Sequence, residues 1–301
     1  MKKILLLGAN GQVGWELQRA LAPLAELVVC DRQRGDLTDL DALQSLVRSE
    51  RPDVIVNAAA YTAVDKAESD VARARLINSE AVERLAIVAS ELDAWLVHYS
   101  TDYVFDGQGN TPVAEDAPTA PLGIYGQTKR DGEMAIRNSG CRHLILRTSW
   151  VYASRGANFA RTMLRLAGQR EELKVVADQV GAPTSAELIA DVTAHILGRL
   201  STDAQLRESA AGTYHLVAGG EVSWHGFAQF LISEALRLGA PLKATPERIL
   251  PISTAEYPLP ARRPANSRLD TRKLQQTFGL VLPPWQFYAT RTIQELIGQH
   301  S

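Results

Sequence analysis

The segment KILLLGANGQVGWEL (residues 3–17) decides the fold. Its apolar start is typical of a buried parallel strand, and Leu17, Leu21 and Leu24 beyond it share one face of a helix. Between strand and helix lies a turn with glycines spaced GxxGxxG rather than GxGxxG. Such a turn lets backbone amides approach a pyrophosphate, whose charge is favoured at a helix N-terminus. We predict that it binds a dinucleotide, although glycines there can also serve close packing alone.

Strands and helices continue to alternate after this segment. Apolar runs typical of strands occupy 26–31, 54–60, 95–101 and 142–152, and helical periodicity occupies 39–53 and 73–93. Asp39 or Asp41 is available to cap the first of these helices, and Pro52 to stop it. This rhythm implies right-handed crossovers, and so predicts an α/β protein with a Rossmann-type, doubly wound parallel sheet.

The second half of the chain has a different texture. Prolines interrupt shorter helical pieces after about residue 150, which predicts a smaller, mixed C-terminal lobe that binds the substrate. Segments 185–200 and 212–219 are regular enough to be a helix and a strand that return to the main sheet. We therefore expect a dinucleotide-binding domain of residues 1–150 plus about 185–218, and a substrate lobe of 151–184 and 219–301.

Composition limits the partners. The chain of 301 residues has a net charge of −2 and a pI near 6.3, which gives no electrostatic reason to expect nucleic acid or a membrane surface. The N-terminal run MKKILLLG is too short for a signal peptide, and no apolar stretch approaches a membrane span. Cys30 and Cys141 lack metal-ligand spacing. We expect a cytoplasmic protein.

The cofactor preference remains open. Asp31 ends the second strand, about 20 residues after the glycine turn, where an acid can bind the adenosine ribose 2′-OH. Arg32 follows at once and could instead bind a 2′-phosphate. Both NADH and NADPH therefore stay possible. The residues expected at the cofactor are Gly8, Asn10, Gly11, Gln12, Val13, Gly14, Asp31, Arg32, Asp36, Leu37, Ala60, Tyr61, Thr62, Tyr99, Tyr125 and Lys129.

A catalytic group is indicated by PLGIYGQTKRDGE (residues 121–133), where a loop turns into a helix. Tyr125 lies four residues before Lys129, so both side chains project from one helical face. An ammonium beside a phenol should lower the phenol pKa from its ordinary value near 10. Thr101 ends the fourth strand, at the edge where ligands bind in such sheets. A hydroxyl, a phenol and a dinucleotide together suit hydride transfer at a carbon–oxygen bond.

These motifs together resemble the extended short-chain dehydrogenase/reductase family. Within it, GQVGWEL, NAAAYTAVDKAE, YSTDYVFDG, YGQTK, RTSWVY, DQVGAPT and RRPANSRL are similar to the reductases of a dTDP-4-keto sugar, and they run over almost the whole chain. The resemblance implies NAD(P)H-dependent reduction of dTDP-4-dehydro-L-rhamnose at C4. This is the last step towards dTDP-L-rhamnose, a precursor of polysaccharides such as lipopolysaccharide O-antigen.

The resemblance also implies roles. Tyr125 donates the proton, Lys129 binds the nicotinamide ribose and tunes Tyr125, and Thr101 orients the keto group. The substrate-binding residues it implies are Thr101, Asp102, Trp150, Arg262, Arg263 and Asn266. Related 4,6-dehydratases have glutamate where this chain has Tyr103, which argues against dehydration.

Alternatives and weaker assignments remain. An epimerase or reductase of another nucleotide sugar would keep the same catalytic set, and a regulatory partner of methionine adenosyltransferase keeps the fold without the reaction. Some family members depend on magnesium at a dimer contact, for which Glu295 is our candidate ligand. We interpret His98, His143 and His215 as core residues, because they lie in apolar strand runs.

Overall fold

The computed structural model describes residues 1–298 and confirms the predicted sheet. Six strands, all parallel, form the sheet in the order β10-β5-β4-β3-β1-β2. The order reverses beside β1, as expected of a doubly wound sheet. Its strands are β1 (Lys3–Leu7), β2 (Glu26–Cys30), β3 (Val54–Asn57), β4 (Trp95–Thr101), β5 (His143–Thr148) and β10 (Gly212–His215).

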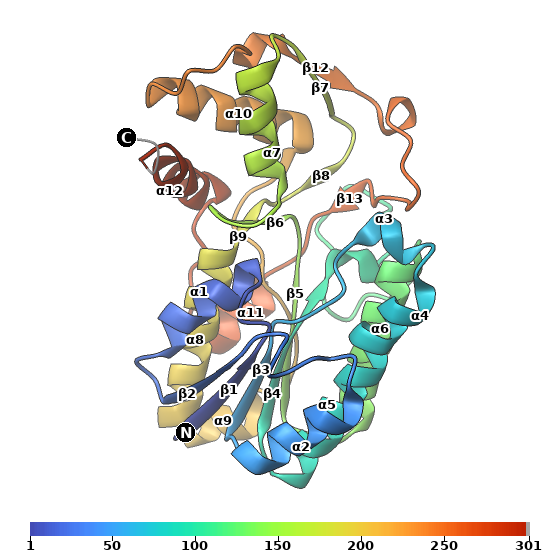
Figure 1. Ribbon diagram of the computed structural model, residues 1–301, viewed down its shortest axis with the longest axis vertical. Coiled ribbons are helices and arrows are strands. Elements are labelled where there is room, and N and C mark those ends of the chain that lie inside the picture. Colours follow the sequence, from blue (N-terminus) through green and yellow to red (C-terminus); the bar gives the residue numbers. More distant parts are fainter. Residues whose placement is uncertain (299–301) are drawn as a thin grey trace.

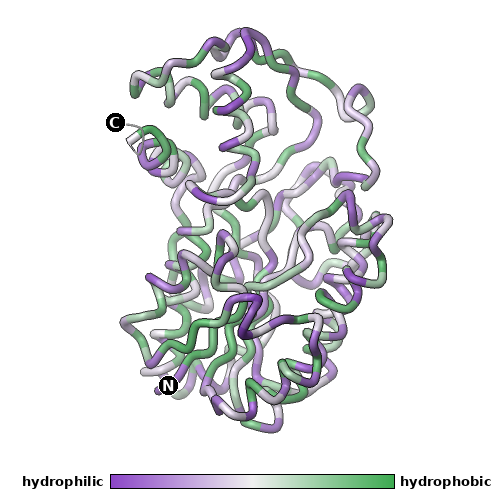
Figure 2. Tube along the Cα trace, in the orientation of Figure 1, coloured by the Kyte–Doolittle hydropathy of each residue, from purple (hydrophilic) through white to green (hydrophobic). Residues whose placement is uncertain are grey.

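Helices cover both faces of this sheet (Figure 1). One face packs against α1 and α8, and the other against α2, α5 and α6, each through a continuous apolar core. The strands stand out as the hydrophobic centre of the lower lobe in Figure 2. The helices of this lobe are α1 (Gln12–Leu21), α2 (Leu40–Glu50), α3 (Val64–Ala67), α4 (Val71–Arg75), α5 (Ala81–Glu91), α6 (Ile124–Asn138), α8 (Ala186–Thr202), α9 (Ala204–Ser209) and α11 (Arg272–Phe278).

Local signals explain several element ends. The Asp39 carboxylate accepts a hydrogen bond from the Ala42 amide and caps α2, and Ser185 caps α8 through the Leu188 amide. The predicted helix over 73–93 instead begins at Val71 and contains a π-helical turn, η1 (Leu76–Glu80). The buried Asn78 in that turn bonds the backbone of Tyr61, which joins the helix to the loop after β3.

The predicted strand over 142–152 is two strands in different sheets. β5 ends at Thr148, Trp150 adopts a left-handed backbone with φ of 50°, and the chain then enters the second lobe. A positive φ at a bulky side chain is costly, so the neighbouring structure must impose it. This bend carries Trp150 across the carboxyl edge of the sheet.

The second lobe lies beyond that edge and contains only short strands (Figure 1). Helices α7 and α10 pack together there, beside the parallel pair β7 and β12. Its elements are β6 (Val151–Tyr152), α7 (Phe159–Gln169), β7 (Leu173–Val176), β8 (Val180–Gly181), β9 (Thr184–Ser185), β11 (Val222–Ser223), α10 (Trp224–Arg237), η3 (Pro246–Arg248), β12 (Ile249–Ile252), η4 (Thr254–Glu256), β13 (Asn266–Ser267) and α12 (Trp285–Gly298). Among residues 1–298, no helix combines the length and apolarity needed to cross a membrane.

Candidate active site

A cleft of about 650 Å³ opens at the carboxyl ends of the parallel strands. It joins the glycine turn, the loop after β3, the end of β4, the start of α6 and the Trp150 bend. Most of the residues predicted from the sequence meet here: Gly8, Asn10, Gly11, Gln12, Val13, Arg32, Asp36, Leu37, Ala60, Thr62, Tyr99, Thr101, Asp102, Tyr125, Lys129 and Trp150.

The glycine turn has room for backbone only. A Cβ on Gly14 would lie 2.1 Å from the Gly8 carbonyl oxygen, and one on Gly8 would lie 2.6 Å from the Ala59 nitrogen. Gly8 also has a φ of +79°, which side chains rarely adopt. Gly11 caps α1 without a side-chain hydrogen bond, so the first amides of the helix keep their donors free. This cradle fits a pyrophosphate.

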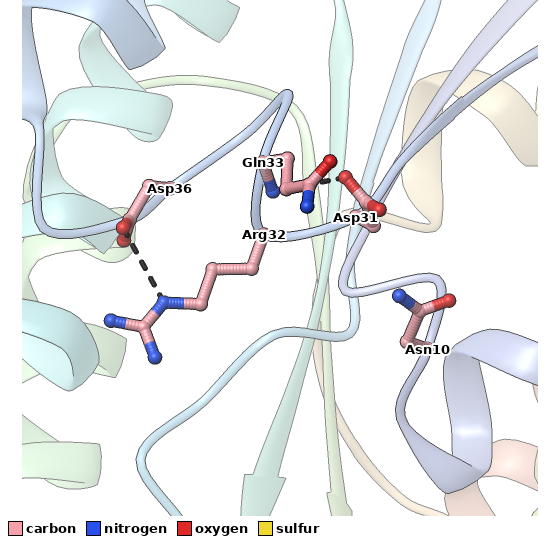
Figure 3. Close-up of a pocket in the computed structure, with 5 residues that line it drawn as sticks. All are labelled: Asn10, Asp31, Arg32, Gln33 and Asp36. Carbon is pink, nitrogen blue, oxygen red and sulfur yellow. Dashed lines mark hydrogen bonds and ion pairs between the residues drawn. The ribbon is translucent and has the colours of Figure 1, made fainter.

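The acidic end of the site forms a second hollow of about 560 Å³ (Figure 3). The Asp31 carboxylate accepts hydrogen bonds from the amides of Gln33 and Arg34 through one oxygen. Arg32 reaches towards Asp36, with 3.4 Å between Nε and Oδ2, and 69 % of its side chain is exposed. The hollow therefore offers a carboxylate for a ribose hydroxyl and a cation for a phosphate.

The catalytic candidates form a hydrogen-bonded chain. Thr101 donates to Asp102 Oδ1 at 3.1 Å, and the same hydroxyl interacts with Tyr125. The Thr101 oxygen also accepts a hydrogen bond from the Tyr103 amide at 3.2 Å. Thr101 and Asp102 are buried and Tyr125 is partly buried, and burial raises the pKa of Asp102 to about 6. The Tyr125 hydroxyl thus brings a transferable proton into the cleft.

Close packing brings α6 to β4. A Cβ on Gly126 would lie 2.1 Å from the Tyr103 carbonyl oxygen, so only glycine permits this approach to η2 (Asp102–Val104). The rings of Tyr103 and Tyr125 meet edge to face, with centroids 5.5 Å apart. Gly126 is therefore needed for the packing of α6 against η2, which its sequence context did not reveal.

The expected fall in the pKa of Tyr125 is wrong for the protein alone. Burial raises that pKa to about 12, and the negative charge of Asp102 adds to the effect, whereas the hydrogen bond with Thr101 opposes it. Lys129 does not offset this, since its Nζ donates to the Tyr99 carbonyl at 2.6 Å. The ring hydroxyl of Tyr99 bonds Thr193 on the opposite face of the sheet.

The expected sugar-binding residues divide into two groups. Trp150 lines the cleft and stacks on Trp224, with ring centroids 3.6 Å apart and planes 11° from parallel. Arg262 is exposed, while Arg263 pairs with Asp65 at 2.7 Å, and neither lines the cleft. The Asn266 side chain bonds the carbonyls of Gln108 and Thr111, outside the cleft as well.

A few functional positions differ from expectation. Tyr61 and Gly14 do not line the cleft, and Asp31 lines only the second hollow. Trp224 and Ser149 also line the cleft, and neither was among the residues predicted from the sequence. Their contribution depends on the bend at Trp150, for which the sequence gives no signal.

The candidate metal ligand Glu295 lies in α12. Its charge, like that of Glu187, raises the pKa of Glu16, although burial is the larger cause. Glu187 is bound by Arg291 at 2.8 Å. Residues 1–298 contain no group of three or more histidine, cysteine or acidic side chains arranged to hold a metal ion. No such cluster surrounds Glu295 in this part of the chain, and the magnesium assignment stays a prediction.

Comparison with known proteins agrees with this geometry. The family described as RmlD substrate binding domain matches residues 1–297. The dTDP-4-dehydrorhamnose reductase of Shigella flexneri is 54% identical over 297 residues, which are 97% of each chain. The crystal structure of a dTDP-4-dehydrorhamnose reductase from Clostridium acetobutylicum matches this chain with a TM-score of 0.86 and 36% sequence identity, and the match covers 99% of each chain. The crystal structure of the dTDP-4-dehydrorhamnose reductase from Bacillus anthracis, in complex with NADP, also matches with a TM-score of 0.86. Its sequence identity is 34%, and the match covers 98% of this chain and 100% of the other. The chain belongs to the RmlD family, that of the dTDP-4-dehydrorhamnose reductases.

Proposed function

We propose that this protein reduces the C4 keto group of dTDP-4-dehydro-L-rhamnose to give dTDP-L-rhamnose, with NADPH or NADH as reductant. The observation that carries the proposal is the Asp102–Thr101–Tyr125 chain, which ends in the same cleft as the glycine turn. Family membership supplies the substrate class, and the reaction completes dTDP-rhamnose synthesis.

The geometry assigns a task to each side chain. Thr101 and Tyr125 can both hydrogen-bond the keto oxygen, which polarises the carbonyl and fixes its orientation. The bound nicotinamide supplies the hydride to C4. As the oxygen gains negative charge, Tyr125 transfers its proton to it and the product hydroxyl forms. The cationic form of Lys129 would stabilise the resulting phenolate and hold the nicotinamide ribose.

Both cofactors have a partner in the second hollow. Arg32 is exposed and held only weakly by Asp36, so it is free to bind a 2′-phosphate. Asp31 keeps one oxygen outside its turn, which suits a ribose 2′-OH. We propose that the enzyme accepts NADPH and NADH.

The remaining assignments belong to the same proposal. Residues 1–150 with about 185–218 bind the dinucleotide, and 151–184 with 219–301 bind the nucleotide sugar. Trp150, at the boundary, contributes to the sugar site, and Arg262, Arg263 and Asn266 join it on substrate binding. A cytoplasmic location is supported by the two free, buried cysteines, Cys30 and Cys141. A homodimer and a magnesium ion at Glu295 stay predictions from the family resemblance.

The test follows oxidation of NADPH and NADH, in parallel, with dTDP-4-dehydro-L-rhamnose. Tyr125→Phe should lower kcat by about 10²–10⁴-fold, as loss of a general acid does, and keep cofactor binding. Tyr214→Phe is the matched control, since its hydroxyl is also buried but bonds Ala210 far from the cleft.

Three outcomes would contradict the proposal. Full activity of Tyr125→Phe would remove the proton donor. Sugar conversion without net NAD(P)H consumption would identify an epimerase, and absence of any conversion by the folded wild-type protein would favour the regulatory alternative.

A further inference from the structure

Three polar side chains form a buried cluster beneath the cleft. Asn57 and His98 are each 1% exposed and Lys129 is 2% exposed. Asn57 and His98 are paired residues on the neighbouring strands β3 and β4, and Lys129 reaches His98 from α6. Only Lys129 has a role in the proposed reaction, so the buried amide and imidazole require a separate explanation.

The orientation of the Asn57 amide is fixed by the backbone. Asn57 Oδ1 accepts a hydrogen bond from the Ala59 N–H at 3.1 Å. Asn57 Nδ2 therefore faces His98 Nδ1, at 3.2 Å, and must donate to it. An imidazole nitrogen that accepts carries no proton. The neutral ring then holds its proton on Nε2, and burial together with Lys129 keeps the pKa of His98 well below its ordinary value.

The protonated Nε2 of His98 points at Lys129. Its distance to Lys129 Nζ is 3.1 Å, and Nζ itself donates to the Tyr99 carbonyl. An ammonium has three donors and no acceptor, so it would set two N–H groups against each other at this contact. A neutral amine has one lone pair, which can accept a hydrogen bond from His98 Nε2–H, while one of its own N–H groups donates to the Tyr99 carbonyl.

We propose that His98, locked by Asn57 with its proton on Nε2, is a positioning residue that donates to Lys129 and favours the neutral amine in the free enzyme. Its catalytic meaning rests on the proposed function: Lys129 can then lose and regain a proton near neutral pH. The direction agrees with burial, which lowers the pKa of Lys129 to about 8.

Other charged groups around Lys129 act in the opposite sense or lie further off. Glu133, one turn later on α6, raises the pKa of Lys129, but its carboxylate is shared with Arg147 from β5. Tyr125, one turn earlier, interacts with Thr101 and, through charge, with Asp102 of η2. The helical segments η1 and α5 also pack against α6, but their charged side chains Glu80, Glu83 and Arg84 are exposed to solvent.

The first test reads the tautomer directly. Long-range ¹H–¹⁵N NMR of the free protein labelled with ¹⁵N-histidine distinguishes Nε2–H from Nδ1–H, and His98→Leu assigns the signals. We expect the Nε2–H form from pH 6 to pH 9. An Nδ1–H ring, or an imidazolium at neutral pH, would overturn the proposal. No substrate is needed, so a failed reductase assay would leave this result intact.

The second test follows the Lys129 amine by ¹³C NMR against pH. In His98→Leu the donor is gone, and the titration midpoint should rise by about one pH unit, equivalent to about 1.4 kcal/mol. In Asn57→Asp a carboxylate faces Nδ1, so His98 should switch to Nδ1–H and the midpoint should rise at least as far. His143→Gln is the control, because that ring bonds the Cys141 carbonyl at the opposite end of β5.

Unchanged Lys129 midpoints in both variants would refute the role of His98. If His98→Leu does not fold, Asn57→Asp and the wild-type tautomer still decide the question. The pH profile of kcat should move with the Lys129 midpoint, which loss of packing alone would not produce.

Discussion

Gly14→Ala tests the cofactor cradle most directly. The added Cβ would lie 2.1 Å from the Gly8 carbonyl oxygen, against about 3.0 Å as the shortest contact that real Cβ atoms show. The start of α1 must therefore move by about 0.9 Å from the end of β1. The obstacle is backbone, so no flexible side chain can give way.

Two effects of the substitution oppose each other. Alanine stabilises a helix by about 0.8–1.0 kcal/mol relative to glycine. Overpacking a close contact costs about 1–3 kcal/mol, and here it displaces two elements of the sheet core. The clash should win, with a net loss of up to about 2 kcal/mol in unfolding free energy. Because the displaced amides face the pyrophosphate, the Kd for NADPH should rise by tenfold or more, which corresponds to about 1.4 kcal/mol.

Gly168→Ala in α7 is the matched control. It lies in a helix, and a Cβ there meets no atom within 4 Å. That variant should gain up to about 1 kcal/mol and bind NADPH as the wild type does. Urea unfolding measures the first quantity and nicotinamide fluorescence titration the second. If Gly14→Ala had the same unfolding free energy and the same Kd for NADPH as Gly168→Ala, the close approach of β1 and α1 would not limit stability or cofactor binding.

Two further predictions concern buried charge and are measured by urea unfolding. Burial raises the pKa of Asp102 to about 6 from 3.8, so its carboxylate destabilises the fold above pH 6 and this penalty fades as the pH falls towards 3.8. Asp102→Asn should thus gain about 1–3 kcal/mol at pH 8 but little at pH 4, and a gain independent of pH would contradict this cause. Arg147 binds the Glu133 carboxylate, which is 0% exposed, at 2.7 and 2.8 Å. Arg147→Met removes this main partner and should lower the free energy of unfolding by about 3–5 kcal/mol. Adding Glu133→Leu should recover most of that loss, whereas a further decrease would show that the pair is not the reason.

Much of the fold followed from local pattern. The apolar runs and helical periodicity located the strands of the main sheet, because a strand buried on both faces must be apolar throughout. The turn after β1 was predictable for a similar reason, since its glycines satisfy a local backbone requirement. Thr101, Tyr125 and Lys129 were found by spacing and by their place at strand ends, and the structure brings them into one cleft.

Other features depend on contacts between distant segments. The left-handed Trp150, its stack on Trp224 and the π-helical turn at Asn78 join parts of the chain that no sequence window contains. The placement of Arg263 depends likewise on Asp65, far away in sequence.

The sequence by itself determined the doubly wound sheet, the dinucleotide turn and the choice of candidate catalytic side chains, because periodicity, backbone freedom and residue chemistry are local properties. Only the tertiary structure decided the ionisation of those side chains. Burial set the pKa of Tyr125 and of Lys129, and the neighbour that faces Lys129 is a histidine from another element. Desolvation and hydrogen-bond direction depend on what surrounds a group in space, so they arise only once the chain has folded.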